Sequence, residues 1–321
     1  MTARAPDGST PRTWWRVAQA VLLLALFAFI ARAVAEQRDA LRETAANLEV
    51  HWGGIAGASA LVLLTYAALV QSWRLLVAGW GSTLSYPAAV RIWTIANLGR
   101  YIPGKVWSVG ALVVLAQREG VNAVAATGAA MLGTLLNLGA GFGVVLLSGS
   151  LVLDALGPGY RTAAWLGSAA FVAGTLALPW LLPAVLRTLA RRRPSLELPA
   201  RELPARAVWL AVAINLLSWV GYGSAFLLLT RAVLPEVSGA LVAYIAIWTA
   251  SYLVGYLVLI APGGIGAREA ALVAAFVALG MASSAEAAIV AAASRLWLIA
   301  LEVLPGLLSL ALAPAARRRR S

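Results

Sequence analysis

Long apolar runs separated by short polar segments make up almost the whole chain. A hydrocarbon layer of ~30 Å is crossed by ~20 helical residues, and several runs reach this length. The uninterrupted runs are residues 15–34, 52–73, 122–149, 162–186, 207–230 and 285–311. The pattern predicts an all-α integral membrane protein, built as a polytopic helical bundle.

Two further apolar stretches, 87–116 and 238–282, are each interrupted by a Pro-Gly pair. Proline removes a backbone donor and clashes with the preceding turn, so each pair predicts a break in a helix. The pairs are Pro103-Gly104 and Pro262-Gly263. Each broken stretch therefore predicts two short helices.

The polar segments between the runs predict surface structure. Residues 35–51 are expected to form a short surface helix, and residues 187–206 form one sizeable polar loop with six Arg. Four Arg at 317–320 precede the final residue, Ser321, and we expect residues 1–14 and 313–321 to be short tails that flank one transmembrane domain over 15–312.

Composition supports a membrane location. The chain is 61% hydrophobic and 12% charged, whereas soluble domains are about half apolar and a quarter charged. The net charge of +12 could indicate nucleic acid, but the Arg residues cluster in loops beside apolar runs, as membrane orientation requires. We predict no nucleic-acid partner, an inner (plasma) membrane location and cytoplasmic termini. Segment 35–51, where acidic residues offset Arg, should be external. The run 15–34 is interpreted as a retained anchor.

Little in the composition suggests a metal or cofactor. The sequence has no cysteine, which excludes disulfides and thiolate ligands, and its one histidine, His51, lies at the edge of a run. A usual zinc site needs further His or Cys ligands. We predict no metal and no cofactor, and His51 is interpreted as an interfacial residue.

An internal repeat links the two broken stretches. Arg74 precedes an Ile-Trp-Thr tripeptide at 92–94 and the break at Pro103, and Arg231 precedes the same tripeptide at 247–249 and the break at Pro262. The predicted repeats are about 52–149 and 207–311. If each broken stretch is a re-entrant hairpin, the repeats have opposite topology, as in many transporters. The alternative is that 238–260 crosses the membrane fully.

The first break resembles a phosphate-binding P-loop only superficially. In GRYIPGKV, Val106 occupies the position of the Ser or Thr that would hold magnesium, and no strand precedes the glycine. We therefore predict no nucleotide partner. One alternative is a simple turn in which Arg100 and Lys105 extend to the lipid headgroups.

The hairpin interpretation predicts an anion site instead. Helices would begin near Lys105 and Gly266, with partially positive N-termini directed to the protein centre. Arg100, Lys105 and Arg268 would complete a pocket for a phosphate or another anion. The residues expected to act as hinges are Gly99, Pro103, Gly104, Pro262, Gly263, Gly264 and Gly266.

Arg295 and Glu302 lie inside the last run, seven residues apart and hence on nearly one helix face. A charge at such depth costs at least ~2.5 kcal/mol and usually marks a pathway or a pair. We predict that both face the cavity, with Glu302 as a candidate for proton coupling; the alternative is an ion pair that holds the bundle together. The complete set of predicted substrate-binding residues is Asn97, Arg100, Tyr101, Lys105, Asn137, Arg268, Glu269, Arg295 and Glu302. Gly139 and Gly143 form a GxxxG, which favours close helix packing.

No catalytic signature is present. The sequence contains neither a GxSxG nucleophile elbow nor an HExxH zinc motif, and no soluble domain of useful size. The protein is therefore not expected to be an enzyme, although intramembrane catalysis through Glu269 or Glu302 stays open.

The two motifs NLGRYIPGKVW, at 97–107, and APGGIGAREA, at 261–270, resemble those of the lysylphosphatidylglycerol synthase transmembrane-region family, the flippase-like domain of multiple peptide resistance factors. The resemblance covers roughly residues 15–312. It implies movement of a lipid between leaflets, often one with an anionic or modified headgroup. Resistance factors continue into a soluble aminoacyl-transferase domain, whereas this sequence ends at Ser321, so lipid aminoacylation is not expected.

The predicted function is a lipid translocase whose partners are anionic or polyprenyl-phosphate lipids, with a separately encoded lipid-modifying enzyme as a second partner. The alternative is a membrane scaffold that recruits a lipid glycosyltransferase through its basic loop.

Overall fold

The computed structural model describes residues 50–102, 106–148, 158–192, 201–258 and 264–312, and the regular elements in these ranges are helices. Four of them are long and apolar enough to cross a membrane: α3 (Trp52–Gly79), α6 (Ala123–Leu147), α9 (Ala205–Val233) and α12 (Ser284–Ala311). They confirm the spans predicted at 52–73, 122–149, 207–230 and 285–311. The chain is a multi-pass membrane protein. The span predicted at 15–34 and nearly all of segment 35–51 lie outside the described residues.

Local signals explain where these helices begin and end. The Asn122 side chain accepts hydrogen bonds from the backbone N–H groups of Val124 and Ala125, at 2.9 and 3.2 Å, and so caps α6. At the start of α12, Ser283 and Glu286 form a reciprocal capping box. Helix α3 continues six residues past the predicted end. The charged Arg74 is accommodated within the helix because its Nε donates a hydrogen bond to the Leu84 carbonyl at 2.6 Å.

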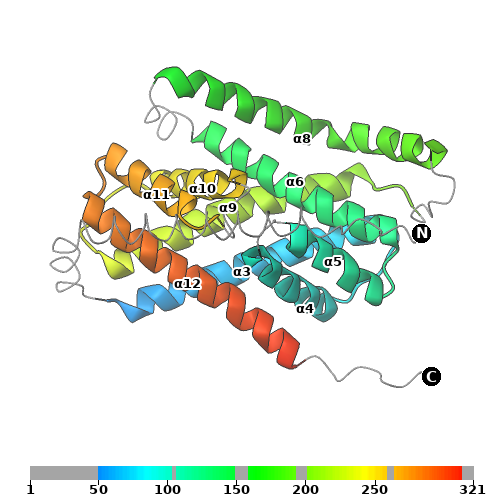
Figure 1. Ribbon diagram of the computed structural model, residues 1–321, viewed down its shortest axis with the longest axis horizontal. Coiled ribbons are helices and arrows are strands. Elements are labelled where there is room, and N and C mark those ends of the chain that lie inside the picture. The colour runs from blue at the N-terminus through cyan, green and yellow to red at the C-terminus, as the bar shows by residue number, and fades with distance from the viewer. Residues whose placement is uncertain (1–49, 103–105, 149–157, 193–200, 259–263, 313–321) are drawn as a thin grey trace, which may run out of the picture.

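Helix α8 (Pro158–Arg192) corrects one prediction. The predicted polar loop 187–206 is wrong for residues 187–192, which extend the helix, and for residues 205–206, which begin α9. These residues are good helix formers, and the next helix breaker is Pro194. Within α8 the apolar helical stretch is Trp165–Leu178, shorter than the predicted span 162–186. Helix α8 packs along α6 (Figure 1), where a Cβ on Gly139 would lie 2.1 Å from Thr175 Oγ1, so Gly139 does permit close packing.

The two Pro-Gly stretches each form a pair of short helices. The first pair is α4 (Tyr86–Asn97), followed by a 3-10 turn η1 (Leu98–Tyr101), and α5 (Val106–Arg118). The second pair is α10 (Leu241–Leu257) and α11 (Ala267–Ala278). Helices α5 and α11 begin where predicted. The hinge residues Pro103, Gly104, Pro262 and Gly263, and also Lys105, lie outside the described residues.

The two pairs are located at opposite ends of the long helices (Figure 1). Helices α3 and α9 are antiparallel, because the His51 N–H donates to the Ala232 carbonyl at 2.8 Å while Gly79 lies against Leu203. Helix α4 starts just after Gly79, and α10 starts just after the opposite end, near Ala232. An Arg91–Glu119 ion pair joins the outer ends of the first pair.

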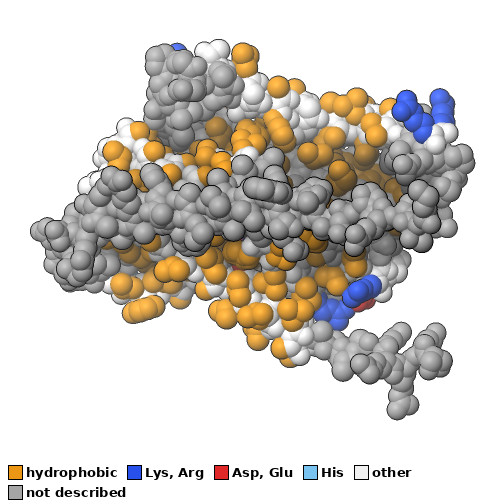
Figure 2. Space-filling model, in the orientation of Figure 1, with side chains coloured by type: hydrophobic (Ala, Val, Ile, Leu, Met, Phe, Trp, Pro, Cys, Tyr) orange, Lys and Arg blue, Asp and Glu red, His pale blue; other side chains and the backbone are white. Residues whose placement is uncertain are grey.

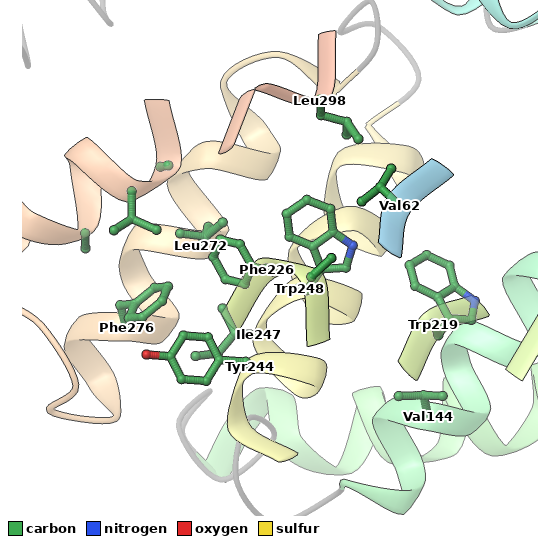
Figure 3. Close-up of a cluster of buried hydrophobic side chains, with 14 of the residues drawn as sticks. Val62, Val144, Trp219, Phe226, Tyr244, Ile247, Trp248, Leu272, Phe276 and Leu298 are labelled. Carbon is green, nitrogen blue, oxygen red and sulfur yellow. The ribbon is translucent and has the colours of Figure 1, made fainter. Parts of the chain in front are cut away.

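An aromatic core fills the space between α9, α10 and α11 (Figure 3). Trp248 and Phe226 are almost fully buried, with ring centroids 4.8 Å apart, and Phe226 also contacts Phe276. Large aromatic side chains contribute most of the apolar area in such a core. This core supports one wall of the site described below.

The outer surface is apolar, as expected for lipid contact. Leu64, Leu217 and Leu296 are 66%, 69% and 70% exposed. In Figure 2 hydrophobic side chains cover most of the described part of the visible face, whereas basic side chains lie toward the ends of the molecule. Soluble monomers rarely expose so much contiguous apolar surface.

Candidate functional site

A cavity of about 220 Å³ lies between the long helices and the inner ends of the two helix pairs. A water molecule occupies about 30 Å³ of liquid, so the cavity has room for several waters or a polar headgroup. The predicted site residues that line it are Asn97, Arg100, Tyr101, Asn137, Arg268, Arg295 and Glu302, together with the predicted hinge Gly264. The structure therefore brings together charged residues that are far apart in the sequence.

Glu302 on α12 is the most highly coordinated carboxylate in the cavity. It is 4% exposed and accepts hydrogen bonds from Tyr66 on α3 at 3.1 Å, from Tyr101 on η1 at 2.6 Å, and from Arg100 Nη1. Arg100 and Glu302 thus form an ion pair. A buried carboxylate is tolerated when a cation and additional donors replace its hydration.

Arg268 on α11 is held in a different way. It is 3% exposed, and its guanidinium carbon lies 4.2 Å from the centroid of the Trp248 ring and 5.6 Å from that of Tyr252. This geometry is a cation–π interaction. Among the described residues its Nη2 has no hydrogen-bond partner. The cavity therefore contains a positively charged group that still has a donor to offer.

Glycine allows Arg268 to reach this position. A Cβ on Gly255 of α10 would lie 2.8 Å from the Cβ of Arg268, so a larger residue would push the helices apart. Gly264 and Gly266, two of the predicted hinges, have φ values of 72° and 85°. These left-handed conformations suit glycine and turn the chain sharply into α11.

Arg295 and Glu269 form a second ion pair, with Nη1 and Oε1 3.6 Å apart. The other oxygen of Glu269 accepts from the Gly266 N–H at 2.6 Å, which closes the first turn of α11. Arg295 lines the cavity, whereas Glu269 is not among the lining residues. Arg295 and Glu302 do face one cavity from α12, as their spacing predicted, but they pair with Glu269 and Arg100 respectively.

Neutral polar groups line another part of the cavity, contributed by the long helices. Asn137 on α6 donates to the Asn215 side chain at 2.9 Å, and Asn215 donates to the Ser72 hydroxyl at 3.0 Å. All three residues line the cavity. The Trp219 indole also donates to the Asn137 carbonyl at 2.9 Å.

Asn137 was predicted from the sequence, whereas Tyr66, Ser72, Asn215 and Trp248 were not. An asparagine in the middle of an apolar span is a usable signal, because its amide requires partners there. Tyr66 and Trp248 gave no such signal, since their rings fit an ordinary apolar core.

Gly99, another predicted hinge, lets η1 lie directly against the start of α5. A Cβ at this position would be 2.8 Å from the Ser108 backbone nitrogen. The close approach positions Arg100 and Tyr101 at the cavity wall. Within the described part of the chain, no group of three or more His, Asp or Glu residues could hold a metal ion.

Apolar spans around a buried, charged cavity define a polytopic helical membrane protein with a polar site at membrane depth. Residues 14–306 match the family described as the lysylphosphatidylglycerol synthase TM region, and the chain belongs to this family. The match confirms the family resemblance of the two motifs. A comparison with curated proteins finds no match. Family and spans together identify a lipid-related membrane protein, which is compatible with a transporter-like role.

Proposed function

We propose that the protein is a translocase that moves a lipid with an anionic or phosphate-linked headgroup between the leaflets of the membrane. The observation that carries this proposal is Arg268, whose buried guanidinium lines the cavity while its Nη2 lacks a hydrogen-bond partner among the described residues. A guanidinium binds phosphate oxygens with good geometry. A phosphate that entered the cavity would satisfy this donor.

The remaining site residues would replace the hydration of the headgroup. Without such replacement, burying a charge is prohibitive. Arg100 and Arg295 line the same cavity, as do the neutral groups of Asn97, Tyr101 and Asn137. In this proposal Lys105 adds a further cation, Glu269 holds Arg295 in place, and Glu302 is the group available for proton coupling.

The positions of the helix pairs support alternating access. Helix α4 has 12 residues and spans about 18 Å, which is too short to cross a bilayer. Even α10, the longest of the four, has only 17 residues. Two short pairs that enter from opposite ends and meet at one cavity fit re-entrant hairpins in inverted repeats, at about 52–149 and 207–311. Rocking of one repeat against the other would then expose the cavity to each side in turn.

The distribution of basic residues supports a cytoplasmic location for the end that carries α4 and α5. Cytoplasmic loops carry an excess of Lys and Arg. At the other end, the described arginines outside the cavity are Arg161 and Arg231. At the α4–α5 end they are Arg74, Arg91, Arg118, Arg187, Arg191, Arg192, Arg201 and Arg206. Both chain termini would then lie in the cytoplasm, at the inner (plasma) membrane.

The test is lipid exchange in reconstituted vesicles. Full-length protein is placed in liposomes that contain a fluorescent phosphatidylglycerol, and an impermeant quencher reports how fast lipid reaches the outer leaflet. Wild type should accelerate exchange over protein-free liposomes. Arg268→Gln should slow it by about tenfold or more, since a hydrogen bond to a charged group contributes roughly 1.5–3 kcal/mol. Arg231→Gln, an exposed arginine outside the cavity, is the matched control and should be as fast as wild type.

A wild-type protein that moves neither anionic phospholipids nor polyprenyl phosphates faster than empty liposomes would contradict the proposal and favour the scaffold alternative. Conversion of the lipid to a new product, detected by mass spectrometry, would favour an intramembrane enzyme.

A further inference from the structure

We propose that Glu302 binds one proton whenever the cavity binds an anion, so that the anion and the proton are carried together. The role in transport rests on the proposed function, whereas the linkage between anion and proton concerns binding alone. The proton then moves with the anion and not against it. The linkage depends on the contact between Arg100 and Glu302 and not on the total charge of the cavity, to which Lys105 would also contribute.

The surroundings of Glu302 stabilise its negative charge through one ion pair. Glu302 is 4% exposed, and its Oε1 accepts from Arg100 Nη1 and from the Tyr66 hydroxyl at 3.1 Å, while Oε2 accepts from the Tyr101 hydroxyl at 2.6 Å. Arg295, on the same helix, lines the cavity and pairs with Glu269. The described titratable or charged groups of other elements that interact electrostatically with Glu302 are Tyr66 on α3, Arg100 and Tyr101 on η1, Tyr222 on α9 and Arg268 on α11.

An anion in the cavity acts on Glu302 by charge repulsion. Arg268, the anion-binding group in the proposed function, lines the same cavity as Glu302 and interacts with it electrostatically. An anion bound there brings a second negative charge into the field of the carboxylate. Two negative groups that share a site cannot both stay ionised easily, and the weaker acid takes the proton. Beside a phosphodiester, the weaker acid is the carboxyl group.

The anion also competes with Glu302 for Arg100. The Arg100 side chain lines the cavity and is 28% exposed, whereas that of Glu302 is 3% exposed. If Arg100 turns to the anion, the carboxylate keeps only hydroxyl donors, and a buried charge without a partner is neutralised instead. The proton, taken from solvent, binds at Oε1, the oxygen that Arg100 leaves. Tyr66 and Tyr101 can go on donating to the carboxyl group, and the new O–H offers a donor to the anion.

Binding one negative charge together with one proton leaves the net charge of the cavity unchanged. The loaded and the empty protein therefore bury the same charge, and the cost of holding charge at membrane depth is the same for both. If the anion were bound alone, the two forms would differ by one elementary charge, on which the membrane potential acts. For a headgroup with one negative charge, transport should therefore respond to a pH gradient and not to the potential.

The experiment counts the protons taken up when a lipid binds. Full-length protein in detergent is titrated with a short-chain phosphatidylglycerol by calorimetry at neutral pH, in two buffers of different ionisation enthalpy. The difference in heat gives the number of protons. Wild type should take up about one proton per bound lipid, and its dissociation constant should fall up to about tenfold for each unit by which the pH is lowered. A wild-type protein that takes up no proton would overturn the inference.

Variants assign the proton to Glu302. Glu302→Gln mimics the protonated carboxyl group, so it should bind the lipid at least as tightly as wild type, without proton uptake and independently of pH. Glu236→Gln, an exposed acid outside the cavity, is the matched control and should keep the proton uptake. His51 is present in all these proteins, so its titration cancels in the comparison.

Proton uptake that persists in Glu302→Gln, or loss of binding in this variant while it stays folded, would overturn the assignment. If Glu302→Gln does not fold, the double variant Arg100→Gln, Glu302→Gln decides the same point, because no charge is left in the pair. It should likewise take up no proton.

Transport under a pH gradient separates the linkage from the translocase. In liposomes whose interior is more alkaline by about one pH unit, wild type should accumulate fluorescent phosphatidylglycerol in the inner leaflet, compared with protein-free liposomes under the same gradient. Redistribution driven by an imposed potential instead would contradict the uptake of one proton per lipid. Protein that takes up a proton on binding but moves no lipid would contradict the translocase and leave the linkage intact. Protein that accelerates exchange without proton uptake would do the reverse.

Discussion

At the residue scale, the buried Glu302 carboxylate needs Arg100 as a partner more than Arg100 needs Glu302. The Glu302 side chain is 3% exposed, whereas that of Arg100 is 28% exposed. Removing Arg100 therefore leaves a buried carboxylate with only the two tyrosine hydroxyls as donors. We expect Arg100→Ala to lower the free energy of unfolding by about 3–5 kcal/mol, the usual cost of breaking a buried ion pair on one side. Thermal unfolding in detergent micelles measures the effect.

Neutralising Glu302 should recover much of the stability that Arg100→Ala loses. In the double variant Arg100→Ala, Glu302→Gln no buried negative charge is left, so its stability should lie well above that of Arg100→Ala alone. The pair is coupled, and a double-mutant cycle isolates the coupling. If the double variant unfolds at the same temperature as Arg100→Ala, the ion pair contributes nothing and the account of Glu302 is wrong.

The sequence was sufficient to select most of these charged residues but not to pair them. Arg100, Arg268 and Glu302 stand out because charges inside apolar runs are costly and therefore rare. Their partners lie up to 236 residues away in the sequence, as Tyr66 and Glu302 do, and no local pattern carries that information. For the same reason the Tyr66 hydroxyl was missed.

At the element scale, the site depends on close contact between α12 and α4. Gly306 of α12 lies one turn beyond Glu302, and a Cβ there would be 2.8 Å from Leu98 Cδ2 and 3.0 Å from the Thr94 carbonyl. A hydrogen bond of 2.8 Å between Thr94 and Ser309 ties the same two helices together. A larger residue at Gly306 would move Glu302 away from η1.

We therefore expect Gly306→Leu to destabilise the protein by about 1–3 kcal/mol through overpacking, and to weaken phosphatidylglycerol binding as well. The matched control is Gly174→Leu on α8, where a new Cβ meets nothing within 4 Å. This control should be neutral or stabilising by up to about 1 kcal/mol, because leucine is the better helix former. Thermal unfolding and lipid retention by native mass spectrometry compare the two variants. Equal behaviour of both would contradict a tight α12–α4 contact.

The ends of helices were predicted correctly where a capping residue or a helix breaker determines them. Asn122 and Ser283 cap α6 and α12, and the predicted starts at 122 and 285 agree with the structure to one residue. The predicted span ended at residue 73, just before Arg74, whereas α3 continues to Gly79 and the Arg74 side chain donates to a nearby carbonyl. Charge in a side chain ends a membrane helix less reliably than a backbone signal does.

At the scale of the whole molecule, the proposed inverted repeat requires the two helix pairs to enter from opposite membrane faces. Arg91 and Glu119 pair across the outer ends of α4 and α5, and Gly239 lies against Met281 across the outer ends of α10 and α11. Each pair thus returns to the end from which it started. Because α3 and α9 are antiparallel, those ends are opposite ends of the molecule, as the proposed inverted hairpins require.

Single-cysteine labelling tests this arrangement, and the absence of native cysteine provides a clean background. Thr83→Cys and Gln117→Cys flank the α4–α5 pair, whereas Ser238→Cys and Ser284→Cys flank α10–α11, and all four positions are exposed. An impermeant maleimide added to intact cells should label only Ser238→Cys and Ser284→Cys, and added to inside-out vesicles only the other two. Permeabilised cells, in which all four should react, control for reactivity. Labelling of Ser238→Cys and Ser284→Cys from different sides would mean that residues 238–282 cross the membrane and that the repeats are not inverted hairpins.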